Sequence, residues 1–271
     1  MAIDVSPVDV SPVRSPPPLQ RSPASDGAAY LRALLVPAAL VAAAVALHVS
    51  GLDKRLTDQF FDTSSGLFPR RSDPLLELVG HGMARSFALL VWFGVLAVAL
   101  ASLRVIELRA YRTTLWPLVT AMALGPLVVV VLKDITSFPC PWNLKGYGGF
   151  AAEPTTWFVL PRDAGRCFPS GHSAGGFSFL AFYFAAMARR QQRLARVALL
   201  FAVAAGSAFS IVRLVQGAHF LSHALWAAAI DWLLAALVFL PSTLGPRPSS
   251  LPAAADSPWA TGDADGAEAA Q

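Results

Sequence analysis

Three polar clusters interrupt the apolar stretches of this chain of 271 residues. Lys133 ends one apolar run, Pro169-Ser170-Gly171-His172 opens the next, and Arg213 stands six residues before His219. Lysine and arginine neutralise oxyanions, a Ser-Gly turn at a helix start offers backbone N–H groups, and imidazoles move protons or a phosphoryl group. The three clusters together indicate a site for a phosphate ester.

The composition shows how such distant clusters can meet. The chain is 55% hydrophobic and only 14% charged, which is typical of an integral membrane protein and not of soluble domains. Its net charge of +4 does not indicate nucleic-acid binding, because the arginines stand in short loops between apolar runs and not on one basic face. We therefore expect lipid as the partner and no nucleic acid.

Six apolar runs predict the fold, because each is near the ~20 residues that a helix needs to cross a hydrocarbon layer of ~30 Å. We expect an all-α, six-span transmembrane bundle over residues 28–241, with the motif-bearing core at 133–231. The Pro-rich segments 1–27 and 242–271 are predicted to be disordered tails. The spans are expected at residues 29–49, 86–103, 113–132, 173–188, 197–216 and 220–240.

Arginines in two short loops orient this bundle. Three lie between the second and third spans and four between the fourth and fifth, and such loops are expected to be cytoplasmic. Both termini are then also cytoplasmic, and the three polar clusters lie on the outer, periplasmic face of the inner (cell) membrane. The aromatic-rich segment 51–74 is expected to lie along this interface.

The two cysteines, Cys140 and Cys167, fall in the same predicted outer segment. An oxidising compartment would permit a disulfide, which would contribute roughly 3 to 4 kcal/mol in the chain-entropy model. Two unpaired thiols in a packed loop are the alternative.

The ordered clusters resemble the three-part signature of the type 2 phosphatidic acid phosphatase superfamily, which includes lipid phosphatases and vanadium haloperoxidases. The resemblance covers residues from about 113 to 235. It implies that His219 attacks phosphorus, that His172 protonates the leaving alkoxide, and that water then hydrolyses the phosphohistidine. It also implies a metal-independent phosphatase that needs no cofactor, and we infer no obligate protein partner. The phosphoryl oxygens would be held by Lys133, Ser170, the Gly171 backbone and Arg213.

Three positions depart from the family pattern. His223 stands where Asp usually orients the nucleophilic imidazole, so His223 is expected to accept a hydrogen bond from His219. Cys140 replaces an Arg, and Val212 replaces a common Ser. Arg166 is the favoured substitute for the missing cation, because a disulfide would draw it toward the site; the other candidates are Lys145 and Arg162.

Other readings remain open from the sequence. His219 and His223 could form a metal pair, joined by His172. Asp231, deep in the last span, could bond to Ser207 or Ser210 of a neighbouring helix or have a role in transport. The remaining polar candidates, His81 and Arg85, could face the site or pack in a loop.

The enzyme could also be a lipid-to-lipid phosphotransferase, because a phosphohistidine can yield to an acceptor other than water. A non-catalytic lipid-binding or transport protein on the same scaffold is the rival from another class.

Overall fold

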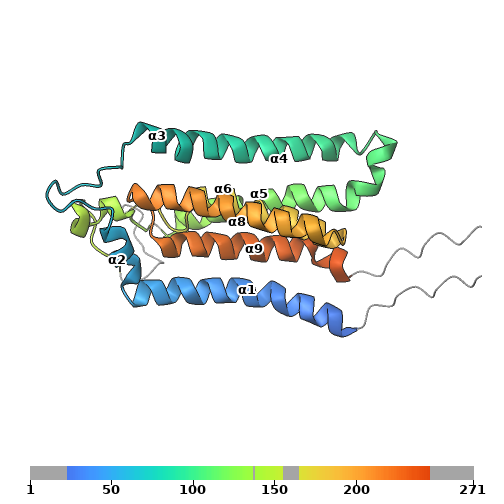
Figure 1. The fold of residues 1–271 in the computed structure, drawn as a ribbon, viewed down its shortest axis with the longest axis horizontal. Helices are drawn as coiled ribbons and strands as arrows, with labels where there is room; N and C mark the ends of the chain where they lie inside the picture. Colours follow the sequence, from blue (N-terminus) through green and yellow to red (C-terminus); the bar gives the residue numbers. More distant parts are fainter. Residues whose placement is uncertain (1–22, 137, 155–164, 245–271) are drawn as a thin grey trace, which may run out of the picture.

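The computed structural model describes residues 23–136, 138–154 and 165–244, and in these ranges it is helical apart from loops and two isolated β-bridges. Long helices lie side by side, and the loops gather at the two ends (Figure 1). The long helices are α1 (Pro23–Val49), α4 (Ala84–Ala101), α5 (Arg112–Thr136), α8 (Gln192–Val215) and α9 (Leu221–Leu244). The short ones are α2 (Leu52–Asp58), α3 (Pro74–Glu77), α6 (Gly171–Phe177), α7 (Leu180–Ala188), a π-helical turn η1 (Leu78–Met83) and the 3₁₀ turns η2 (Ile106–Tyr111), η3 (Pro141–Asn143) and η4 (Lys145–Tyr147).

Four helices of the described chain are long and apolar enough to cross a membrane, or five if the bent pair α1–α2 is one span. The all-helical membrane class is therefore confirmed, whereas the number of six is not. The predicted span 173–188 is divided into α6 and α7, each shorter than a span. Gly175, Gly176 and Ser178 explain the break, because glycine weakens a helix and the Ser178 hydroxyl bonds the Gly175 carbonyl at 2.8 Å.

The helices also extend beyond the predicted boundaries. Helix α1 begins at Pro23, inside the predicted tail 1–27, and α9 runs to Leu244, inside the predicted tail 242–271. Proline suits the first turn of a helix because its missing N–H needs no partner there. The remainder of both tails, 1–22 and 245–271, lies outside the described residues.

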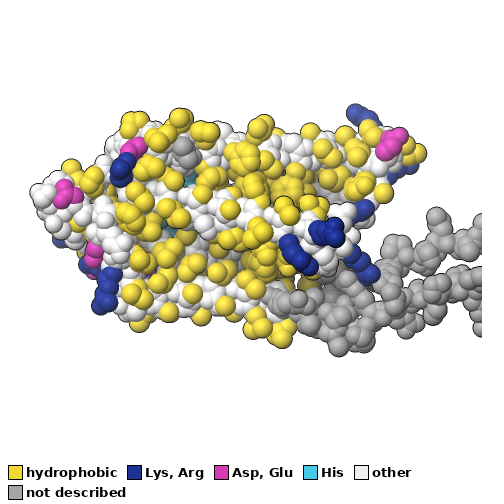
Figure 2. All heavy atoms as spheres, in the orientation of Figure 1, with side chains coloured by type: hydrophobic (Ala, Val, Ile, Leu, Met, Phe, Trp, Pro, Cys, Tyr) yellow, Lys and Arg dark blue, Asp and Glu magenta, His cyan; other side chains and the backbone are white. Residues whose placement is uncertain are grey.

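The two arginine-rich loops meet at one end of the bundle. Arg189 donates to the carbonyl of Ala110 at 3.1 Å, and its guanidinium lies 4.5 Å from the centre of the Tyr111 ring. The start of α1 and the end of α9 lie at this end too, and α2 with the loop segments 138–154 lies at the other (Figure 1). On the face that Figure 2 shows, the charged side chains lie near the two ends and hydrophobic side chains are spread over the surface between them.

Segment 51–74 closes the loop end of the bundle. Helix α2 turns by 71° from α1, and the Asp53 carboxylate accepts a hydrogen bond from the Ser222 N–H, 3.0 Å away, at the start of α9. Phe68 is buried against Tyr147, with ring centres 5.3 Å apart. Asp53 and Phe68 thus hold loops and helix starts together, and the interfacial position of the segment stays a prediction.

Two glycines let α6 and α8 touch through their backbones. A Cβ placed on Gly176 would lie 2.6 Å from the Cα of Gly206, too close for any real contact. Gly175, next along the same helix, has open space around its Cβ position. This close approach sets the distance between the helices that carry His172 and Arg213.

We expect Gly176→Ala to lower the melting temperature of the detergent-solubilised protein, with a cost of roughly 1–3 kcal/mol, because two backbones must separate. Gly175→Ala is the matched control and should be neutral or stabilising by roughly 0.5–1 kcal/mol, since alanine favours the helix. Equal effects of the two substitutions would contradict the backbone contact.

Candidate active site

The three polar clusters meet at the loop end of the bundle. The rings of His172, at the start of α6, and His219, in the turn between α8 and α9, have centres 6.4 Å apart. The Lys133 ammonium, at the end of α5, lies 3.4 Å from the position that a Cβ on Gly171 would take. The convergence predicted for Lys133, Gly171, His172 and His219 is therefore present in the structure.

A backbone carbonyl fixes the tautomer of His219. The His219 Nδ1 atom lies 2.7 Å from the carbonyl oxygen of Cys167. Because a carbonyl only accepts hydrogen bonds, Nδ1 carries the proton in this contact, and Nε2 keeps a free lone pair. His219 is thus prepared to act as a nucleophile through Nε2.

His223 does not provide that hydrogen bond. Its ring centre is 5.9 Å from that of His219, and neither of its ring nitrogens has a hydrogen-bond partner among the described residues. The ring is fully buried and meets the rings of Phe138, Phe168 and Phe220 edge-on, at 5.0, 5.2 and 5.4 Å. The expected His219–His223 bond is wrong, because the Cys167 carbonyl takes the acceptor position.

A chain of hydroxyls leads to Ser170. The hydroxyl oxygens of Ser210 and Ser173 lie 2.8 Å apart, and those of Ser173 and Ser170 lie 2.7 Å apart. The Gly206 carbonyl, 2.6 Å from the Ser210 hydroxyl, can only accept, so Ser210 donates to Gly206 and accepts from Ser173. The Ser170 oxygen accepts from the Ser173 backbone N–H, as the cap of α6. Ser173 then accepts from the Ser170 hydroxyl, so this chain of hydroxyls holds Ser170 in place at the start of α6.

Arg213 is buried beside an aromatic ring. Its guanidinium carbon lies 5.6 Å from the centre of Trp142, its Nη1 donates to Gln216 at 2.8 Å, and its Nε has no hydrogen-bond partner among the described residues. Arg71, from the segment before α3, lies over the same ring at 4.6 Å. The sequence assigned no role in the site to Arg71, Trp142 or Gln216, although Trp142 and Gln216 stand within the polar clusters and their flanks.

The predicted disulfide joins Cys140 and Cys167, whose Cα atoms are 5.0 Å apart. Arg166, beside it, lies near Lys133 but forms an ion pair with Asp134, and its side chain is 63% exposed. Arg166 is therefore near the site, but its guanidinium is paired with Asp134. Arg162 lies outside the described residues.

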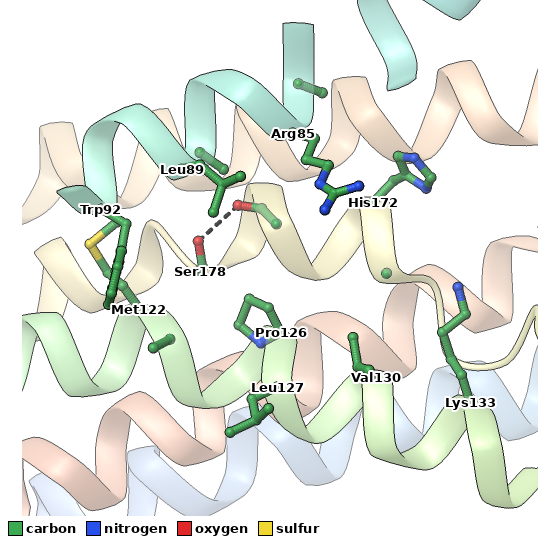
Figure 3. Close-up of a pocket in the computed structure, with 15 residues that line it drawn as sticks. Arg85, Leu89, Trp92, Met122, Pro126, Leu127, Val130, Lys133, His172 and Ser178 are labelled. Carbon is green, nitrogen blue, oxygen red and sulfur yellow. Dashed lines mark hydrogen bonds between the residues drawn. The ribbon is translucent and has the colours of Figure 1, made fainter. Parts of the chain in front are cut away.

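Arg85 lies closer to the predicted site residues in the sense that it shares a cavity with two of them. It lines one cavity with Lys133 and His172 (Figure 3). Of the two readings that the sequence left open for Arg85, the structure shows the one in which it faces the site. The side chain of His81 is not among the described ones.

Asp231 has neither of the serine partners that the sequence suggested. Its carboxylate is buried without a hydrogen bond among the described residues, and it fills the space beside Gly125 of α5, where any Cβ would overlap it. Ser210 bonds to Ser173 and to the carbonyl of Gly206 instead.

No group of three or more His, Cys, Asp or Glu side chains in the described ranges is arranged to hold a metal ion. Among the described residues, the three histidines are therefore not arranged as a three-ligand metal site.

Comparison with known proteins agrees with this geometry. Residues 114–242 match the PAP2 superfamily, and this stretch contains every residue predicted for the site. The chain belongs to the type 2 phosphatidic acid phosphatase superfamily. A lipid A 4'-phosphatase of Francisella tularensis subsp. novicida (strain U112) is 26% identical over 196 residues, which cover 69% of this chain and 86% of that relative. No solved structure matches the chain.

The surroundings of His219 favour its neutral form. Burial, and then the positive charge of Lys133, lower the pKa of His219 well below its ordinary value of 6.5. A neutral imidazole is the form that can attack phosphorus.

We expect ¹⁵N spectra of histidine-labelled protein to show His219 neutral at pH 6.5, with its proton on Nδ1. Because burial and the charge of Lys133 disfavour the protonated ring, the lowered pKa means that His219 takes up a proton only at a pH well below its ordinary pKa. His219→Gln assigns the signal. An imidazolium spectrum for His219 at pH 6.5, or a proton on Nε2, would contradict the assigned hydrogen bond.

Proposed function

We propose that this protein is an integral membrane phosphatase that hydrolyses the phosphate monoester or diphosphate of a lipid through a phosphohistidine intermediate. The observation that carries the proposal is the pair of imidazoles, His219 and His172, with ring centres 6.4 Å apart beside the Lys133 ammonium. A nucleophile and a proton donor each need a reach of about 3 Å to the group between them. One phosphoryl group fits that separation.

In the first step, His219 Nε2 forms a bond to phosphorus while the bond from phosphorus to the lipid oxygen breaks. His172 gives its proton to that oxygen, so the lipid alcohol leaves neutral. In the second step, water gives a proton to His172 and its oxygen attacks phosphorus, which releases phosphate and restores His219.

The remaining polar groups stabilise the charge that develops on phosphorus. Lys133 supplies an ammonium near the start of α6 and Arg213 a guanidinium, and Ser170 lies at the same helix start. The Gly171 backbone N–H completes the set, and Arg166 contributes long-range positive charge. Such preorganised charge is usually the largest contribution to a reaction of this kind. The proposed chemistry needs no metal, no cofactor and no protein partner.

The position of the site favours a lipid substrate. A lipid anchored in a bilayer presents its phosphate at headgroup level, which is where an end of the apolar bundle would lie. The similarity to a lipid A 4'-phosphatase supports this substrate class. Phosphatidate, phosphatidylglycerophosphate, undecaprenyl diphosphate and a phosphate of lipid A are the candidates that we would assay.

The arginine-rich end favours one orientation. The loops that meet through Arg189 and Ala110 would be cytoplasmic in the inner membrane of a bacterium, together with both termini. The site at the opposite end would then face the periplasm.

We expect purified protein to release free phosphate from at least one of the four lipids without an acceptor, and vanadate to inhibit the release. His219→Ala and His172→Ala should each lower kcat by at least about a hundredfold, because each removes a group that acts on the reacting atoms. Phosphate release that requires a second lipid would instead show a phosphotransferase. Turnover by both alanine variants at the wild-type rate would contradict catalysis and favour a lipid-binding or transport protein.

We expect His223→Phe to retain most of the activity, because the ring fits among phenylalanines and its nitrogens make no hydrogen bond among the described residues. The measurement is kcat against that of His219→Phe, which should be inactive. A loss in His223→Phe as large as in His219→Phe would show that a nitrogen of His223 takes part in catalysis.

A further inference from the structure

A cavity of about 610 Å³ runs from the site into the bundle, between α4, α5 and α6 (Figure 3). The catalytic end carries Lys133, His172 and Arg85. The other end is closed by Trp92 and Met122. The proposed chemistry uses only the charged end, so the apolar remainder has no role in it.

The polarity of this cavity changes along its length. Its charged side chains all lie near the site, and the wall beyond them is apolar apart from the Ser178 hydroxyl, which is bonded within α6. The cavity is therefore complementary to an amphiphile with an anionic head and an apolar tail. A soluble phosphate ester would use only one end of it.

The cavity has the length of one membrane leaflet. Lys133 and Met122, both on α5, are about 16 Å apart along the helix axis at ~1.5 Å per residue. This is close to half of the ~30 Å hydrocarbon layer. A chain that starts at headgroup level would thus end near the middle of the bilayer.

Small side chains create the space, and exposed ones border it. Ala88, Ala123 and Gly175 line the middle of the cavity, and a Cβ on Gly175 would meet nothing within 4 Å. Leu89 and Leu127, on opposite walls, are 45% and 59% exposed, so in a membrane they face lipid. A hydrocarbon chain can therefore enter sideways, without leaving the bilayer.

We propose that this cavity binds one acyl chain of the substrate lipid, while Arg85 and Lys133 hold the phosphate at its charged end. The inference rests on the proposed function, because it takes the bound phosphate to be that of the lipid. It adds a specificity determinant: the apolar wall selects a substrate by its chain, and Gly175 is the position where that selection can be blocked.

The test compares Gly175→Leu with Gly94→Leu. Both replace a helical glycine that has open space around it, but Gly94, on α4, does not line the cavity. The substrates are dihexadecanoyl and dihexanoyl phosphatidate in the same detergent, and the measured quantity is the ratio of their kcat/KM values. A leucine side chain that excludes about two methylenes should lower this ratio about tenfold in Gly175→Leu, and the ratio should stay at the wild-type value in Gly94→Leu.

A measurement without turnover uses Trp92 as the reporter. In His219→Ala protein, phosphatidate with a brominated acyl chain should quench tryptophan fluorescence more than brominated phosphatidylcholine does. That difference should disappear in Trp92→Phe and in Gly175→Leu, each combined with His219→Ala. Equal quenching by the two lipids, or an unchanged ratio of kcat/KM in Gly175→Leu, would overturn the acyl-chain site.

The two proposals fail in different ways. Wild-type protein that releases no phosphate from any of the four candidate lipids contradicts the proposed function, whatever the quenching shows. Wild-type protein that releases phosphate equally well from both phosphatidates contradicts the chain site alone.

Discussion

The hydrogen bond from His219 to the Cys167 carbonyl is the contact on which the proposed chemistry of this site depends. It sets which imidazole nitrogen carries the proton and so which one can attack. Its acceptor is fixed from two sides. The disulfide to Cys140 ties Cys167 to the segment after α5, and the Cys167 N–H donates to the Phe138 carbonyl at 2.9 Å. The tautomer of His219 is thus determined by how a loop is anchored.

The same end of the bundle is held together mainly through backbone groups around the start of α9. The Trp142 N–H donates to the Gly217 carbonyl at 3.0 Å, and the Ser170 N–H donates to the His223 carbonyl at 3.1 Å. The Asp53 carboxylate accepts from the Ser222 N–H. Segments from α2, η3 and the start of α6 therefore meet at α9, and a shift of any one of them would move the imidazole of His219 relative to that of His172.

The long helices and part of the site could be predicted from the sequence, because long apolar runs and charged motifs are visible in it. It placed α1, α4, α5, α8 and α9 to within several residues and brought Lys133, His172 and His219 together, because hydropathy and topology decide both. It missed the break between α6 and α7, since Gly175 and Ser178 also occur inside continuous helices. It could not find the Cys167 carbonyl, because every residue has a carbonyl and only folding selects one. Arg85, too, was left undecided until the packing of α4 against α5 aimed it at the cavity.

The departures from the family pattern become connected once the acceptor of His219 is known. In that pattern an Asp orients the imidazole and an Arg adds positive charge, whereas here His223 and Cys140 stand at those positions. Cys140 replaces the charge with a covalent bond to Cys167, and the Cys167 carbonyl then does the orienting that the Asp would do. His223 does not bond to His219 and packs among phenylalanines instead. The disulfide at the position of the missing Arg therefore also anchors the residue whose carbonyl is the hydrogen-bond partner of His219. A neutral carbonyl stabilises a positive imidazole less than a carboxylate does, so under the proposed mechanism this arrangement orients His219 but gives less electrostatic stabilisation than an Asp would.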